Sequence, residues 1–166
     1  MGSNLGDSRR IFEEAVARLE AAVGPLELAP LYLTEPVSPI PQPPYLNSVA
    51  LGACELAAPD LLALMQQVES QLGRDRERPQ AARTLDLDLL LLGDEVRQGA
   101  PPLLPHPRMR ERRFVLAPLC DVAPEWRIPP DGATACELLH RLPERPWARR
   151  LPEPLRPAPT DPVRRP

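Results

Sequence analysis

The chain has 166 residues, 43% of them hydrophobic, and carries a formal net charge of -3 at pH 7. This length suits a single globular domain, and the acidic balance argues against a protein whose main partner is nucleic acid. All 20 basic residues are arginine, so a Walker-type nucleotide site or a Schiff-base mechanism, both of which need a lysine, is excluded.

Hydrophobic spacing predicts an alternation of helices and strands. The first helix has Asp7 or Ser8 available as its N-cap and Gly24 at its end, and a later helix carries Pro59 in its first turn. In chain order the predicted elements are a helix at residues 8–23, strands at 26–33 and 46–54, a helix at 59–72, a strand at 85–92, and helices at about 110–120 and 135–141. This order indicates an α+β fold, one strand short of β-α-β-β-α-β.

The 25 prolines are spread unevenly, with clusters in a loop at residues 36–44 and in a C-terminal stretch at residues 151–166. The loop joins two predicted strands and is long enough to be functional. The C-terminal stretch has no apolar periodicity and cannot repay the entropy of ordering, so we expect a disordered tail. We therefore predict one domain at residues 1–150, followed by this tail.

The three cysteines, Cys54, Cys120 and Cys136, are widely spaced in apolar surroundings. That pattern fits neither a disulfide framework nor a zinc site, and it favours a reducing compartment. The N-terminus shows no signal peptide, and no apolar run approaches the roughly 20 residues that cross a bilayer. We therefore expect a cytoplasmic protein without a membrane partner.

The last predicted strand begins with two aspartates, Asp86 and Asp88, two residues apart. Strand side chains alternate, so both carboxylates point to the same face, roughly 6.5 Å apart along the backbone. Two ionised carboxylates placed together form a ready site for a hard cation such as Mg²⁺. The alternative is an exposed strand face with two solvated aspartates.

Several motifs follow one another along the chain: Gly2-Ser3-Asn4-Leu5-Gly6-Asp7, Thr34-Glu35-Pro36-Val37, Pro44-Tyr45-Leu46-Asn47, Gly73-Arg74 with Arg76, Arg83-Thr84-Leu85-Asp86-Leu87-Asp88, and Pro105-His106-Pro107 with Arg112, Phe114 and Pro118. In this order they resemble the 6-hydroxymethyl-7,8-dihydropterin pyrophosphokinases of folate biosynthesis. The resemblance covers about residues 2–132.

The resemblance implies a ferredoxin-like α/β sandwich with a mainly antiparallel sheet, here lacking its first strand. It also implies transfer of the pyrophosphoryl group of ATP to the hydroxymethyl oxygen of 6-hydroxymethyl-7,8-dihydropterin, with release of AMP. Asp86 and Asp88 match the pair that holds two Mg²⁺ ions, which bridge the ATP phosphates. ATP and the dihydropterin are the expected partners, nucleic acid is not, and the expected oligomeric state is a monomer.

On the nucleotide side, Arg74 and Arg83 match the family's catalytic arginines, whose planar forks pair with phosphate oxygens. Arg112 and His106 match further ATP-binding positions, and Glu69 matches a glutamate near the nucleotide. The alternative for the arginines and for Glu69 is a solvated surface charge. The alternative for His106 is a packed or surface histidine.

On the pterin side, Tyr45 and Phe114 match the aromatic residues that sandwich the flat bicycle, which suits stacking between rings. Asn47 matches an amide that reads the edge of the ring, and backbone groups from Thr34 to Val37 are expected to contact it. The alternative for either aromatic residue is ordinary core packing.

The chain departs from the family pattern in two places. Before Arg83 the family has Arg-Trp-Gly-Pro, whereas this chain has Pro79-Gln80-Ala81-Ala82, so closure of this loop over the substrates is expected to differ. The family also has about half a dozen residues before the position of Gly2, which form a central strand. We hypothesise that the true start lies upstream.

Two rival readings remain open from the sequence. The first is an RNA-binding module of ferredoxin-like architecture, with the arginines of residues 74–83 and 108–113 as its surface. The acidic balance and the lack of an aromatic-rich strand speak against it. The second is an inactive relic of the enzyme.

Overall fold

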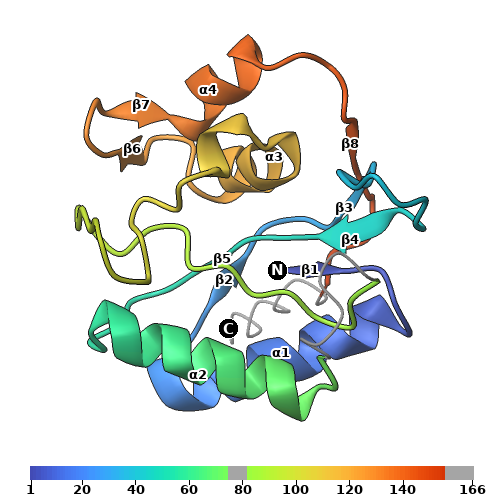
Figure 1. Ribbon diagram of the computed structural model, residues 1–166, viewed down its shortest axis with the longest axis horizontal. Coiled ribbons are helices and arrows are strands. Elements are labelled where there is room, and N and C mark those ends of the chain that lie inside the picture. The colour runs from blue at the N-terminus through green and yellow to red at the C-terminus, as the bar shows by residue number, and fades with distance from the viewer. Residues whose placement is uncertain (75–81, 156–166) are drawn as a thin grey trace, which may run out of the picture.

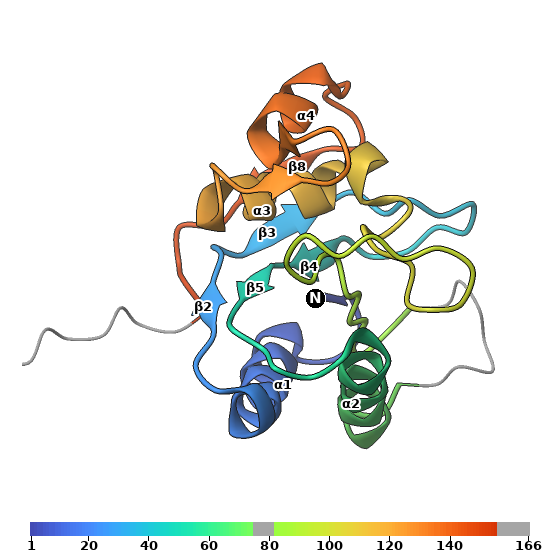
Figure 2. The same ribbon diagram turned by 90° about the vertical axis from the view of Figure 1, so that its left-hand side faces the viewer.

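The computed structural model describes residues 1–74 and 82–155, which form three layers (Figure 1). A small sheet lies in the middle, with two helices on each side of it, and the turned view in Figure 2 shows the same arrangement. On one side lie α1 (Ser8–Val23) and α2 (Ala58–Gln71), and on the other α3 (Arg113–Val122) and α4 (Ala135–Arg141). The predicted α+β class is confirmed.

The central sheet has the strand order β1-β4-β3-β8, and all its pairings are antiparallel. Its strands are β1 (Gly2–Ser3), β3 (Tyr32–Thr34), β4 (Tyr45–Asn47) and β8 (Ala148–Arg150). Two smaller antiparallel ladders join β2 (Glu27–Leu28) to β5 (Ala50–Leu51) and β6 (Arg127–Ile128) to β7 (Ala133–Thr134).

The helix predictions agree closely with the structure. α1 has the predicted bounds, and the Asp7 side chain caps it by accepting from the Arg10 N–H at 3.1 Å. α4 also has the predicted bounds, and Thr134 and Glu137 form a capping box at its start. The helix expected at 110–120 is instead divided into a short 3-10 turn, η1 (Met109–Glu111), and α3, because Arg112 between them is extended.

The predicted strands are shorter than expected. Residues 26–33 divide into β2 and β3 around Pro30, which has no N–H to donate to a ladder. Residues 46–54 likewise divide into β4 and β5. The strand predicted at residues 85–92 is wrong as a regular element: only Asp86 forms a bridge, with Gly2, and the N–H of Leu87 donates to the Glu69 carboxylate instead.

The first strand, which was expected to be missing, is present as a strand of two residues. Gly2 and Ser3 form β1, which lies between β4 and Asp86. Beside it the Met1 ammonium donates to the Ser48 carbonyl at 2.9 Å, and burial lowers the pKa of this amine. A cavity of about 180 Å³ adjoins Met1, lined mainly by residues 49–54 and 87–92.

The C-terminal stretch is packed as far as the structure describes it. The Leu151 N–H donates to the Leu31 carbonyl at 2.8 Å, and the Leu155 side chain is only 4% exposed. The packed chain therefore continues at least to Leu155, beyond the predicted domain boundary at residue 150. The rest of the expected tail, residues 156–166, lies outside the described residues, as do Arg76 and the divergent positions 79–81.

Two apolar cores hold the layers together. One lies between the α1–α2 pair and the sheet and includes Phe12, Val16 and Leu85. The other lies under α3 and α4 and includes Leu116 and Ile128. No helix in the described part of the chain is long and apolar enough to cross a membrane.

The cysteine expectation is wrong for one pair. Cys120 on α3 and Cys136 on α4 form a disulfide, whereas Cys54 is free. The two positions are 16 residues apart in sequence, and their spacing gave no sign of a bond because the packing of α4 against α3 brings them together. The disulfide also removes the cysteine argument for a reducing compartment.

Candidate active site

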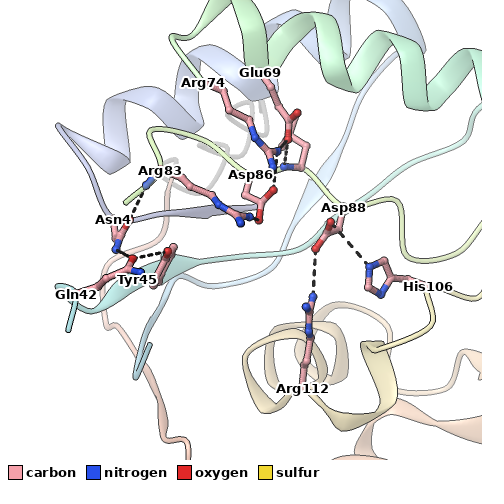
Figure 3. A network of polar contacts seen from close by, with 11 residues as sticks. Asn4, Gln42, Tyr45, Glu69, Arg74, Arg83, Asp86, Asp88, His106 and Arg112 are labelled. Atoms are coloured by element: carbon pink, nitrogen blue, oxygen red, sulfur yellow. Dashed lines mark hydrogen bonds and ion pairs between the residues drawn. The ribbon is translucent and has the colours of Figure 1, made fainter. Parts of the chain in front are cut away.

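Asp86 and Asp88 lie on the same side of the extended segment that follows Arg83 (Figure 3). Leu85 and Leu87 alternate with them and are 0% and 6% exposed, whereas the side chains of Asp86 and Asp88 are 24% and 36% exposed. The alternation predicted from the sequence is therefore present, although this segment is not a regular strand. The two leucine side chains pack into the core, and the two carboxylates both face outward.

Two arginines hold the Asp86 carboxylate. Arg74 Nη1 lies 2.6 Å from Asp86 Oδ1, and Arg83 Nη1 lies 2.5 Å from Asp86 Oδ2. Arg74 follows the end of α2, and Arg83 precedes Asp86 by three residues. The structure thus brings the two predicted phosphate arginines onto one of the two predicted metal ligands.

Glu69, near the end of α2, connects this ion cluster to the backbone of the aspartate segment. Its side chain is 1% exposed, and its Oε1 accepts from the Leu87 N–H at 2.7 Å and also pairs with Arg74. Leu87 lies between the two aspartates, so Glu69 fixes the residue that separates them. Glu69 is not the solvated helix charge of the alternative interpretation.

Asp88 faces the other end of the site, where Arg112 Nη1 lies 3.5 Å from its Oδ2 and His106 Nε2 lies 4.0 Å from its Oδ1. Burial lowers the pKa of His106; the Asp88 carboxylate opposes this change, and Arg112 and Arg108 add to it. The His106 Nδ1 accepts from the Arg108 N–H at 3.2 Å. This arrangement leaves Nε2 as the ring nitrogen directed at Asp88.

A second group of contacts joins the N-terminal loop to Arg83. Asn4 Oδ1 accepts from the Arg83 N–H at 2.8 Å, and Asn4 Nδ2 donates to Gln42 Oε1 at 3.1 Å. The Tyr45 hydroxyl also donates to Gln42 Oε1, at 2.9 Å (Figure 3). Gln42 was missed in the sequence because it is an isolated polar residue in a proline-rich loop, and only the fold brings it to Asn4 and Tyr45.

The predicted pterin residues are gathered only in part. Asn47 Nδ2 donates to Thr34 Oγ1 at 2.7 Å, and these side chains, on adjacent strands, are 7% and 1% exposed. A Cβ on Gly2 would lie 2.9 Å from Asn47 Oδ1, so a side chain at this position would displace the Asn47 amide. Val37 is 68% exposed in the loop after β3, and Phe114 lies at the start of α3 with Arg112 5.3 Å from its ring centroid.

The donor set of the aspartate pair suits Mg²⁺. No group of three or more His, Cys, Asp or Glu side chains is arranged for a metal ion within residues 1–74 and 82–155. Mg²⁺ is commonly held by only one or two carboxylates, with phosphate oxygens and water as its other ligands. Asp86 and Asp88 therefore fit a magnesium ion that binds together with a nucleotide.

Comparisons with known proteins agree with this chemistry. A family model described as 7,8-dihydro-6-hydroxymethylpterin-pyrophosphokinase matches residues 1–124. The chain is 39% identical over 145 residues to the 2-amino-4-hydroxy-6-hydroxymethyldihydropteridine pyrophosphokinase of Pseudomonas aeruginosa, covering 86% of this chain and 89% of the relative. It is 42% identical over 124 residues to the protein of the same name from Bacillus subtilis, covering 74% of each.

Proposed function

The chain belongs to the 7,8-dihydro-6-hydroxymethylpterin-pyrophosphokinase family, and we propose that the network around Asp86 and Asp88 is the site of that family's reaction. The protein is an ATP-dependent pyrophosphokinase of folate biosynthesis. In this reaction the hydroxymethyl oxygen of the dihydropterin loses its proton and bonds to the β-phosphorus of ATP. The bond from that phosphorus to the oxygen shared with the α-phosphate breaks, and AMP leaves.

Asp86 and Asp88 are the residues that hold magnesium in this proposal, as two ions bound with ATP. When bound, magnesium would neutralise the negative charge of the phosphates during transfer. The observation that carries the assignment is the alternation of two outward carboxylates with two buried leucines, next to three arginines and a histidine. A solvated strand face would not concentrate cationic side chains in this way.

Arg74, Arg83 and Arg112 bind the phosphates, and Arg74 and Arg83 stabilise the charge that develops during transfer. Each guanidinium is partly buried beside a carboxylate, with 15%, 31% and 19% of the side chain exposed, so each is already desolvated and oriented. A triphosphate offers them pairs of oxygens, which the planar fork of a guanidinium can contact bidentately. His106 adds a further nucleotide contact through Nε2.

The pterin lies against Tyr45, Asn47 and the turn from Thr34 to Val37, with Phe114 on its other face. The Asn47–Thr34 hydrogen bond supports this assignment because it fixes the amide before the substrate arrives, which lowers the entropy cost of binding. The ferredoxin-like arrangement of the layers, the cytoplasmic location and the monomeric state belong to the same proposal.

The test is AMP release from ATP in the presence of the dihydropterin and Mg²⁺. Asp86→Asn and Asp88→Asn keep the side-chain size but remove the charge, and each should lower AMP formation at least about a hundredfold. Asp94→Asn, an exposed aspartate farther along the same segment, is the matched control and should retain activity. Undiminished turnover in both site variants would reject the metal assignment, and an inactive parent chain would favour the relic.

A further inference from the structure

β3 and β8 run side by side (Figure 1). At the end of their ladder the side chain of Glu35 takes the place of its main-chain carbonyl as a hydrogen-bond acceptor. Thr34 pairs with Ala148, so the next pair is Glu35 with Trp147. The Glu35 N–H donates to the Trp147 carbonyl at 3.0 Å, as an antiparallel ladder requires. The Trp147 N–H, however, donates to the Glu35 side-chain Oε2 at 3.1 Å. A carboxylate oxygen therefore takes the position of the main-chain carbonyl, and the ladder stops there.

The carboxylate of Glu35 is held on its second oxygen as well. Arg145 Nη2 lies 3.4 Å from Glu35 Oε1, with 79% of the Arg145 side chain exposed and 29% of the Glu35 side chain exposed. An ion pair to so exposed an arginine contributes little. The main-chain N–H of Trp147, which is not free to move away, is therefore the contact that fixes Glu35.

We infer that Glu35 is a positioning residue for the pterin: through Trp147 it fixes the direction in which residues 35–37 leave β3. The inference rests on the proposed function, which puts this turn at the substrate. Thr34, just before the turn, is already held by Asn47. Glu35, the next residue, is held by its two hydrogen bonds with Trp147. The anchoring residues, 145–150, lie C-terminal to residues 1–124, which the family model matches.

Two substitutions separate anchoring from charge. Glu35→Ala removes the acceptor for the Trp147 N–H and should weaken dihydropterin binding roughly tenfold or more, because a small displacement of a positioning segment is costly. Glu35→Gln keeps a carbonyl oxygen for this N–H and should bind within about threefold of the parent. Arg145→Ala removes only the exposed ion pair and should bind like the parent chain.

Calorimetric titration with the dihydropterin measures binding without turnover, and steady-state kinetics add KM for each substrate. The expected result is a raised pterin KM in Glu35→Ala with an unchanged KM for ATP. Equal pterin binding by Glu35→Ala and the parent chain would overturn the inference, and so would equal weakening for both substrates. A parent chain that binds no dihydropterin would overturn the proposed function as well, so the two failures are distinguishable.

Discussion

The Arg83 guanidinium lies 2.5 Å from the Asp86 carboxylate, so a residue proposed to bind phosphate neutralises a residue proposed to bind metal. Arg74 occupies the other Asp86 oxygen at 2.6 Å. Two guanidinium groups at such distances compete with a metal ion for this carboxylate. If Asp86 holds Mg²⁺ as proposed, the ion would compete with these arginines, and the phosphates of ATP would offer a displaced arginine a new partner. Nucleotide and metal should therefore favour each other's binding.

Arg83→Ala should consequently raise the affinity for a divalent cation in the absence of nucleotide. The Asp86 carboxylate is then released from one competitor, and because both side chains are partly exposed we expect only about a two- to fivefold gain. Titration with Mn²⁺, followed by electron paramagnetic resonance, measures this affinity directly. The control is Arg97→Ala. It removes a comparable ion pair, in which Arg97 Nη1 lies 3.1 Å from Glu95 Oε1, at a place away from the cluster. Unchanged Mn²⁺ affinity in Arg83→Ala would contradict the competition.

Glu69→Gln should destabilise the folded chain and lower its activity. The substitution removes the charge that Arg74 faces and weakens a hydrogen bond to the Leu87 N–H in a site that is 1% exposed, with an expected loss of about 1–3 kcal/mol. Urea denaturation measures the free energy of unfolding. Glu14→Gln, in an exposed pair with Arg10, should change this free energy by less than about 0.5 kcal/mol. Equal effects of the two substitutions would remove any special role for Glu69.

The sequence predicted what depends on local pattern. The bounds of α1 and α4 follow from apolar spacing and capping residues, and the common face of Asp86 and Asp88 follows from alternation with leucines. The same pattern also predicted a continuous strand at residues 85–92. The hydrogen bond from the Leu87 N–H to Glu69, which replaces a ladder bond there, joins residues 18 positions apart and leaves no local signal.

Other features depend on parts of the chain that meet only in the folded state. Gln42 reaches Asn4 through the course of a proline-rich loop, and β8 joins β3 across more than a hundred residues of sequence. The Cys120–Cys136 bond requires the packing of two helices. None of these contacts leaves a periodic signal, so residue spacing alone did not reveal them.

Acid should remove a contribution that Asp131 makes to stability. The hydrogen bond from Arg110, aided by the Ala133 N–H, lowers the pKa of Asp131 from 3.8 to about 2. Because the folded-state pKa lies below the unfolded value, the contribution is fully present above the unfolded value and is lost as the pH falls through the folded one. Asp131→Asn should therefore be less stable than the parent at neutral pH, and the difference should shrink toward pH 2. Urea midpoints across this range measure it, and a difference independent of pH would contradict the pairing.

The disulfide between Cys120 and Cys136 should make stability sensitive to reductant. It joins α3 to α4 across a sequence separation of 16, and a loop of that size corresponds to about 3 kcal/mol of stabilisation. Cys136→Ser should therefore lower the melting temperature of the oxidised protein, and a thiol reductant should lower that of the parent but not of the variant. Cys54→Ser, at the free cysteine, should keep the reductant effect. Mass spectrometry of unreduced peptides should find these two cysteines joined, and their recovery as free thiols from air-oxidised protein would contradict the bond.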